Sequence, residues 1–339
     1  MNPAQRPPPA ALDASLRQWL APQMQRLTGA AEFDSTALRV EASFRQFYRI
    51  ASTQAHEHSF IVMSAPPALE DNAAFIHIAD VFRTGGIGVP EILAQDADSG
   101  WFLLSDLGVQ DLEAVYATDR KDLAIDAAIA TLIRIQAIED RGIARYTAQR
   151  FADELGIFTE WFVGDMLHLT LPSALEDVFG QLIAQTQAQP QCCIHRDFHC
   201  RNLLYDDAGN LGVVDFQDAL IGPVSYDLAC LLRDCYYAFC EREVNHWCTR
   251  YLALAPIDLA LEAFARALDW TAVQRQLKAI GIFARLAARD GKQSHLAYIE
   301  PVLGRLASVC LGYPDLQSLG NWLDERKADT RHALVARGG

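Results

Sequence analysis

The apolar positions of this chain change their spacing along its length. Between Asp13 and about Arg26 they recur at helical intervals, and a second helical pattern covers 70–83 before Gly85 and Gly86 end it. Elsewhere in this part the apolar residues gather in short strand-like runs separated by turn-forming residues. These runs are 37–42, 47–52, 59–63, VPEILAQ (89–95) and GWFLLSDLG (100–108). The pattern predicts a small antiparallel sheet whose first two strands form a hairpin around SFRQ.

The pattern becomes mainly helical after Gly108. Stretches rich in alanine and leucine at 123–138 and 151–168 have helical periodicity, and further helical patterns run from Tyr226 almost to the end. Only the segment 192–218 interrupts them with short apolar runs and a hairpin signal, DDAGN. We therefore predict a two-lobed α+β protein. Its N-terminal lobe, 1–107, holds a helix, the sheet and one more helix and ends in a hinge, and 108–339 form a helical lobe.

Composition and charge narrow the class of protein. The chain has 339 residues, of which 51% are hydrophobic, so it can build a large core. Its net charge of −14 disfavours nucleic acid and anionic lipid as partners. All eight cysteines follow residue 191 without a CxxC pair, which favours free thiols. Prolines stand where a signal peptide needs its apolar core, and no apolar run is long enough to span a membrane. We expect a soluble, cytoplasmic protein.

The densest polar cluster lies in HRDFHCRN (195–202) and VVDFQD (213–218). Asp197 follows one apolar run, Asn202 precedes the next, and Asp215 ends a third. If the last two runs pair through DDAGN, Asn202 and Asp215 come to the same end of a hairpin. An amide and a carboxylate are suitable oxygen ligands for Mg²⁺, and the remaining aspartate can accept a proton from a hydroxyl. This set matches the needs of phosphoryl transfer.

Two plainer interpretations stand beside this one. Asp197, Asn202 and Asp215 are also residue types that cap strands and turns. A zinc site is a second alternative, although its spacing is irregular and adjacent strand residues point opposite ways. That site would use Cys192, Cys193, His195, His199 and Cys200. We expect His195 to support the loop by packing or hydrogen bonding.

The order His195-x-Asp197…Asn202 followed by Asp215 resembles the catalytic and metal-binding loops of the protein-kinase-like superfamily. DFQ in place of DFG is similar to its aminoglycoside phosphotransferase and choline kinase branch. Five further segments resemble the bacterial anomeric N-acetylmuramate/N-acetylglucosamine kinases of cell-wall (peptidoglycan) recycling, and the resemblance covers about 35 to 305. These segments are SFRQFYRI (43–50), VMSAPP (62–67), LLSDLG (103–108), IGPVSYDLACLLRDCY (221–236) and FARLAARDGKQSHL (283–296).

The resemblance implies a protein-kinase-like fold and transfer of the ATP γ-phosphate to the 1-hydroxyl of an N-acetylated amino sugar. The α-1-phosphate formed would pass to a sugar-1-phosphate uridylyltransferase. Asp197 then corresponds to the catalytic base, and Asn202 and Asp215 to the Mg²⁺ ligands. The hinge that binds adenine corresponds to Leu104, Ser105, Asp106 and Leu107, and the hairpin over the phosphates includes Ser43, Phe44 and Arg45.

Two features depart from the usual kinase pattern. The hairpin tip has no glycine-rich loop, and no lysine precedes Lys121, so the usual phosphate-binding lysine is missing. An arginine of the same hairpin must then supply the charge, and Arg45 and Arg49 are the candidates, since a guanidinium fork suits phosphate oxygens. Both are also typical of solvent-exposed hairpin arginines.

Two charged clusters are candidates for the sugar site. They are Arg233 with Asp234, and Arg289 with Asp290 and Lys292. Facing one cleft, they would bind the sugar hydroxyls and the lactyl carboxylate of a muramic acid. The alternative is a salt-bridge network between helices, for example Arg233 with Asp290. Asp227 is expected to support the catalytic loop.

Two other functions are compatible with the sequence. The same fold with another acceptor, such as an aminoglycoside, is one, although a cationic acceptor would favour an acidic cleft. The other is a pseudokinase that binds nucleotide and serves as a scaffold, which the missing lysine favours and the intact set of Asp197, Asn202 and Asp215 disfavours.

Overall fold

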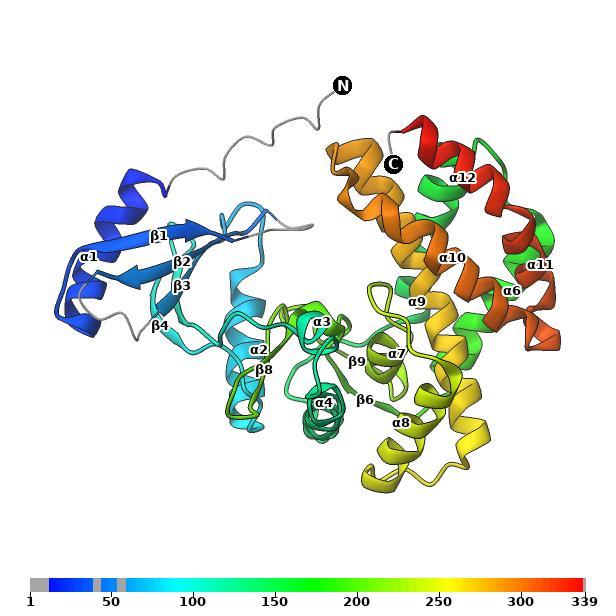
Figure 1. Cartoon of the computed structure of the whole chain (residues 1–339), viewed down its shortest axis with the longest axis horizontal. Coiled ribbons are helices and arrows are strands. Elements are labelled where there is room, and N and C mark those ends of the chain that lie inside the picture. Colours follow the sequence, from blue (N-terminus) through cyan, green and yellow to red (C-terminus); the bar gives the residue numbers. More distant parts are fainter. Residues whose placement is uncertain (1–11, 39–43, 54–58, 338–339) are drawn as a thin grey trace. The chain divides into compact units, whose positions relative to one another are not determined.

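The computed structural model describes residues 12–38, 44–53 and 59–337, and it divides into two compact units (Figure 1). The first unit consists of the described residues up to Gln110 together with Leu204–Gln217, and the second holds the rest of the chain. The chain therefore leaves the first unit near the boundary expected at 107 and returns to it for one hairpin. No pattern in the sequence predicts that return.

The first unit is built on a five-stranded antiparallel sheet in the order β1-β2-β3-β5-β4. The antiparallel sheet and its first hairpin pairing are confirmed, but the first strand begins earlier than predicted. It covers Phe33–Ala37, and 39–42 lie outside the described residues. Side chains alternate between less and more exposed from the buried Phe33 onward. This alternation is not evident in the sequence because most residues of the strand are polar. The elements are α1 (Ala14–Thr28), β1 (Phe33–Ala37), β2 (Gln46–Ser52), β3 (Ser59–Ser64), α2 (Asn72–Thr84), β4 (Ile92–Asp96), β5 (Trp101–Ser105), β7 (Leu203–Tyr205) and β8 (Leu211–Val213).

Each face of this sheet is covered by a helix. Ile50, Val62 and Leu103 form one cluster with the apolar side of α1. Because successive strand residues point to opposite faces, Phe102 lies on the other face, where its ring meets Phe75 of α2 at 5.5 Å between centroids. The sheet is therefore buried on both sides, which explains why its central strands are almost wholly apolar.

The second unit is mainly helical and is organised around the long helix α9 (Figure 1). A core of leucines, phenylalanines and other apolar residues from η1, α6, α9, α10 and α11 fills it. The two-stranded sheet β6-β9 carries the segment with the polar motifs. The elements are α3 (Leu112–Val115), α4 (Lys121–Gln136), α5 (Ala148–Ile157), the π-helix η1 (Phe158–Met166), α6 (Ser173–Gln187), β6 (Gln191–Ile194), η2 (Cys200–Asn202), β9 (Leu220–Pro223), α7 (Tyr226–Leu232), α8 (Glu241–Leu254), α9 (Leu261–Asp290), η3 (Gln293–His295), α10 (Leu296–Leu311), η4 (Pro314–Leu316), α11 (Gln317–Glu325) and α12 (Lys327–Ala336).

Helix α9 contains an unusual run of buried polar residues. Its middle turns are polar yet almost inaccessible, although buried charges are costly unless they are paired. These residues are Asp269, Thr271, Gln274, Arg275, Gln276 and Lys278. Their partners include Glu154 of α5 and, on either side of α7, Ser225 and Arg233. Across the described ranges, no helix has the length and apolar character needed to cross a membrane.

Candidate active site

The loop after β6 is fixed in place by helix α7. The carboxylate of Asp227 accepts hydrogen bonds from the backbone N–H groups of His195 and Arg196, at 2.6 and 2.9 Å. The thiol of Cys230, one turn further along α7, donates to the Arg196 carbonyl at 3.1 Å. Burial raises the pKa of Asp227 to about 7, and the two backbone donors oppose that rise. The expectation that Asp227 supports the loop is confirmed.

Asp234 holds the same loop further along. Its carboxylate is fully buried and accepts hydrogen bonds from the backbone N–H groups of Cys200, at 3.0 Å, and Tyr236, at 2.9 Å. The structure therefore places this predicted sugar-binding residue behind the catalytic loop, where its carboxylate oxygens hold backbone.

Asp197 and Asn202 lie together on this loop. The Asn202 side-chain N–H₂ donates to the Asp197 carbonyl at 3.0 Å, which orients the amide and leaves its oxygen as the atom suited to a cation. The Asp197 N–H donates to Nδ1 of His195 at 3.2 Å. His195 thus supports the loop, as predicted. Backbone groups of Asp197 make these loop contacts, so its carboxylate is not needed to hold the loop.

Cations on two elements surround Asp197. Burial alone would raise the pKa of its carboxyl group, but the charges of Lys278, Arg196 and Arg275 outweigh burial and hold that pKa well below its usual range. Asp197 is therefore ionised at neutral pH. An ionised carboxylate can orient a hydroxyl and accept its proton as the transition state forms.

Glu154 of α5 ties these cations together. Its buried carboxylate accepts hydrogen bonds from Arg196 at 2.7 Å and Gln274 at 3.2 Å, forms an ion pair with Lys278 at 3.2 Å, and accepts the hydroxyl of Tyr146. Burial would raise the pKa of Glu154, but the two cations and these hydrogen bonds lower it. Sequence reasoning missed this network. Its only signal was a lysine and an arginine inside an otherwise buried helical segment.

Asp215 lies in the first unit, two residues after the end of β8. It is exposed, and one of its oxygens accepts a hydrogen bond from the Gln217 side chain at 2.8 Å. The next residue, Phe216, is buried and stacks on Phe75 of α2 at 5.3 Å between ring centroids. The aromatic residue of the DFQ motif thus fixes the segment to α2 and leaves the aspartate at the surface.

Two of the predicted motifs contain strained backbone. Arg196 and Asp215 have φ angles of 77° and 62°, in the left-handed region that is unfavourable for residues other than glycine. Such strain persists only where the surrounding structure imposes it, and it is concentrated at functional sites. The strain is greater at Arg196, because aspartate adopts a left-handed φ more readily than arginine does.

The two candidate arginines of the first hairpin have different partners. Arg45 is buried and forms an ion pair with Glu70, just before α2, at 3.2 Å. Arg49 donates two hydrogen bonds to Asp106, at 2.6 and 3.2 Å, and one to the Gly108 carbonyl at 2.8 Å. Ser43 lies outside the described residues, and the side chain of Phe44 is 65% exposed.

The predicted hinge is held by its own side chains. Leu104 is buried in β5, and the Ser105 hydroxyl accepts the Glu91 N–H at 2.8 Å. Burial would raise the pKa of Asp106, but hydrogen bonds from Arg49, Ser59 and the Gly108 backbone outweigh it and lower that pKa. The side chain of Leu107 packs against Gly212 of β8, where any Cβ would collide with it. Side chains thus fix this segment, and the Ser105 N–H also donates to the Glu91 carbonyl at 2.9 Å.

The two charged clusters predicted for the sugar site are far apart. Arg233 pairs with Asp269 near the start of α9, at 2.8 Å, and with Glu241 at 2.6 Å. Arg289 pairs with its neighbour Asp290 at the other end of the same helix, at 2.8 Å. At a rise of 1.5 Å per residue, Asp269 and Arg289 stand about 30 Å apart along the axis. One sugar cannot touch both clusters, and the pairing of Arg233 with Asp290 is replaced by these pairs.

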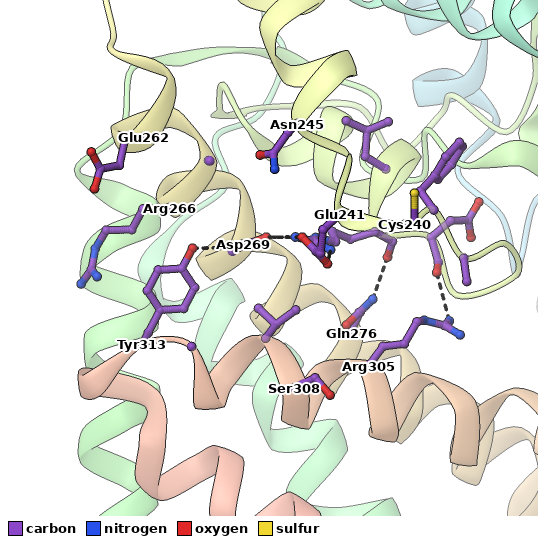
Figure 2. A pocket seen from close by; sticks show the side chains of 18 of the residues that line it. Cys240, Glu241, Asn245, Glu262, Arg266, Asp269, Gln276, Arg305, Ser308 and Tyr313 are labelled. Atoms are coloured by element: carbon purple, nitrogen blue, oxygen red, sulfur yellow. Dashed lines mark hydrogen bonds and ion pairs between the residues drawn. The ribbon is translucent and has the colours of Figure 1, made fainter. Parts of the chain in front are cut away.

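A pocket of about 1460 Å³ lies beside the first of these clusters, wholly within the helical unit (Figure 2). Arg233 and Asp234 are among its lining residues. Figure 2 shows Tyr313 and Gln276 turned toward neighbouring polar groups: the Tyr313 hydroxyl donates to Asp269, and the Gln276 amide donates to the Arg233 carbonyl, both at 2.7 Å. Most of the polar groups on this wall therefore already have protein partners.

The loop residues offer a small set of oxygen donors for a metal ion. Within the described ranges, no group of three or more His, Cys, Asp or Glu side chains is arranged to hold a metal ion. Asn202 offers an oriented amide oxygen, and Asp215 offers an exposed carboxylate. Hard oxygen donors of this kind, few in number, suit Mg²⁺, which keeps several waters and phosphate oxygens as its other ligands.

The fold and the loop define a class. The chain has a five-stranded antiparallel sheet followed by a mainly helical unit, and α7 holds the loop that carries Asp197 and Asn202. This is the architecture of a kinase-like small-molecule phosphotransferase. The chain belongs to the phosphotransferase enzyme family, whose sequence model matches residues 34–274.

Relatives of known activity are similar over most of their length. The chain is 37% identical to an N-acetylmuramate/N-acetylglucosamine kinase of Pseudomonas putida, covering 87% of this chain and 89% of the relative. It is 34% identical to a kinase of the same name from Neisseria meningitidis, over 93% and 96% of the two chains.

Solved structures show the same fold at low sequence identity. An ethanolamine kinase of Plasmodium vivax superposes with a TM-score of 0.66 at 11% identity, over 89% of both chains. An aminoglycoside phosphotransferase solved with ADP gives a TM-score of 0.56 at 14% identity, over 86% of this chain and 97% of the other. The protein-kinase-like fold expected from the sequence is confirmed.

Proposed function

We propose that this protein transfers the γ-phosphoryl group of ATP to the anomeric hydroxyl of N-acetylmuramate, N-acetylglucosamine or both, giving the α-1-phosphate. The observation that carries the proposal is the similarity to N-acetylmuramate/N-acetylglucosamine kinases over nearly the whole length of both chains. A sugar 1-phosphate is the substrate of a uridylyltransferase, so an enzyme of that class would consume the product.

Asp197 is the catalytic residue of the proposal. It orients the acceptor hydroxyl and takes its proton as the bond to phosphorus forms. Three observations favour this role: Asp197 is ionised, its loop is held in place by hydrogen bonds, and its carboxylate does not take part in holding that loop.

Asn202 and Asp215 would hold Mg²⁺. Asn202 precedes β7 and Asp215 follows β8, and these strands pair in one hairpin, which supports their use as a pair. When bound, the ion would neutralise charge on the phosphate oxygens. The oriented amide of Asn202 and the exposed carboxylate of Asp215 support this assignment.

ATP would be bound by the hinge backbone and by an arginine of the first hairpin. The adenine would take its hydrogen bonds from backbone groups between Leu104 and Leu107. Arg45 is the better candidate for the phosphates, because its ion pair with Glu70 before α2 is the arrangement that a kinase lysine makes with a helix glutamate. Arg49 is committed to Asp106 and Gly108.

The acceptor would be bound toward the Arg289 end of α9. Arg233 and Asp234 are used by Asp269, Glu241 and the catalytic loop, so they support the site from behind. Arg289 and Asp290 are exposed on the other end of the helix.

The proposal is tested by ADP release from ATP and Mg²⁺ with N-acetylmuramate, N-acetylglucosamine, glucose and kanamycin as acceptors. Turnover is expected with the N-acetylated amino sugars only. Asp197→Asn should lower kcat by a factor of about 10² to 10⁴ and leave ATP affinity nearly unchanged, whereas Asp177→Asn, at an exposed position of α6, should change neither. Bound ATP with no turnover of any acceptor would contradict the proposal.

A further inference from the structure

Three basic residues of α9 lie on one face of the helix. Lys278, Arg285 and Arg289 have the spacing i, i+7 and i+11, which brings successive side chains to nearly the same direction. Lys278 stands at the catalytic end of this stripe, because its charge acts directly on Asp197. Arg285 follows about 10 Å further along the axis. The stripe therefore leads from the catalytic carboxylate to the exposed end of the helix.

Arg285 differs from the other two because it has no partner among the described residues. Lys278 is paired with Glu154, and Arg289 is paired with Asp290. Arg285 forms no ion pair or hydrogen bond with any residue that the structure describes, and its Nε atom is buried without an acceptor. Burial and the neighbouring charge of Arg289 lower its pKa, and the nearest acids, Asp290 and Glu160, act on it only at a distance.

A half-buried guanidinium without a counter-ion is costly unless something else supplies the negative charge. The guanidinium fork matches a carboxylate with two parallel hydrogen bonds. A carboxylate reaching Arg285 would satisfy its buried donor and relieve the repulsion from Arg289.

We propose that Arg285 binds the carboxylate of the acceptor and so determines the preference for an acidic sugar over a neutral one. This inference rests on the proposed function. N-acetylmuramate carries a lactyl carboxylate, and N-acetylglucosamine is the same amino sugar without it. With the anomeric hydroxyl at Asp197, a lactyl carboxylate that extended along the stripe of α9 would approach Arg285. Arg285 is thus a specificity-determining residue, and Arg289 stays with Asp290.

The test compares the two sugars on the full-length protein. In Arg285→Gln we expect the KM for N-acetylmuramate to rise about 10- to 100-fold, since a hydrogen-bonded charge pair is lost. The KM for N-acetylglucosamine and both kcat values should stay within about twofold. Arg285→Lys, which keeps the charge without the fork, should recover part of the loss. Arg331→Gln is the matched control, because Arg331 is an exposed arginine of α12 paired with Glu300.

The outcomes separate this inference from the function on which it rests. If the wild-type protein phosphorylates neither sugar, the proposed function fails. If it phosphorylates them and Arg285→Gln changes both sugars equally, or neither, the inference fails while the function stands. Calorimetric titration of the nucleotide-free protein with each sugar, together with the melting temperature of each variant, distinguishes lost carboxylate binding from lost folding.

Discussion

Arg45 and Arg49 illustrate how two residues of one type acquire different roles. Both belong to the first hairpin, and the sequence leaves open which one replaces the absent lysine. Arg45 is buried beside Glu70, whereas Arg49 closes on Asp106 and Gly108 at the hinge. The partner of each side chain, which depends on tertiary structure, separates them.

This difference gives a prediction for the two variants. Arg45→Gln should raise the KM for ATP about 10-fold or more, because a charge-assisted contact to phosphate is lost. Arg49→Gln should leave that KM within about twofold and instead lower stability by about 1–3 kcal/mol, through lost hydrogen bonds to a charged group. Steady-state kinetics and urea unfolding measure both. A larger effect of Arg49→Gln on the KM for ATP would reverse the assignment.

Asp106 makes stability depend on pH. Its pKa is lower in the folded protein than in the unfolded chain, where an aspartate titrates near pH 3.9. The unfolded state therefore binds the proton more tightly, so the stabilisation from Asp106 is full above about pH 4 and is lost as the pH falls further.

The corresponding variant is Asp106→Asn. It should be less stable than the wild type by about 1–2 kcal/mol at pH 7, and the difference should shrink as the pH falls below about 4. Urea unfolding at several pH values measures it. Asp80→Asn, at an exposed pair with Arg83, is the control and should show no such trend. A difference that is constant with pH would contradict the assigned role.

The candidate site residues differ in whether the neighbouring sequence is enough to identify them. Asp197, Asn202 and Asp215 could be proposed from the sequence because each stands at the end of an apolar run at a recognisable spacing. Lys278 and Glu154 could not, because they reach Asp197 through packing of helices far apart in the sequence. Arg233 and Arg289 are equally visible as charges, and only the length of α9 shows that they cannot serve one ligand.

At the scale of elements, α9 depends on one glycine. A Cβ on Gly281 would lie 2.6 Å from the backbone nitrogen of Phe158 and 2.7 Å from the Ile157 carbonyl, where the π-helix η1 begins. The sequence predicts one continuous helix over 151–168, and the structure changes from α to π at this contact. Hydrophobic spacing predicts that a helix forms, but the wider turn coincides with a close approach that spacing does not encode.

Gly281→Ala should therefore separate α9 from η1. We expect a loss of about 1–3 kcal/mol of stability, or more, because the methyl group meets backbone that cannot rotate away. Gly304→Ala on α10 is the matched control, since nothing lies within 4 Å of its added Cβ, and it should be neutral or stabilising. Equal unfolding midpoints in urea for the two variants would show that the contact is looser than described.

At the scale of the molecule, the N-terminal unit is discontinuous. The hairpin within Leu204–Gln217 completes it: the Tyr205 N–H donates to the Gln110 carbonyl at 2.9 Å, and the Val213 N–H donates to the Gly88 carbonyl at 2.7 Å. Phe216 fills the space beside Phe75 and Phe82. The sequence predicts the first boundary well because the apolar pattern changes there. It does not predict the return, since a short hairpin carries no mark of the unit against which it packs.

A fragment of residues 1–110 should consequently fail to unfold cooperatively, because it lacks Phe216 and both backbone contacts. Joining Leu204–Gln217 to Gln110 through a short flexible linker should restore cooperative unfolding, since Gln110 and Tyr205 are already neighbours. Thermal denaturation followed by circular dichroism compares the two. Cooperative unfolding of the shorter fragment would show that the hairpin is an accessory.

The central claim concerns the atom that is phosphorylated, and product analysis tests it most directly. The purified protein is incubated with ATP, Mg²⁺ and N-acetylmuramate or N-acetylglucosamine, and the product is identified by ³¹P and ¹H NMR. We expect an α-anomeric proton coupled to phosphorus, which marks a 1-phosphate. A phosphate on any other hydroxyl, or no sugar phosphate while ATP is bound, would contradict it.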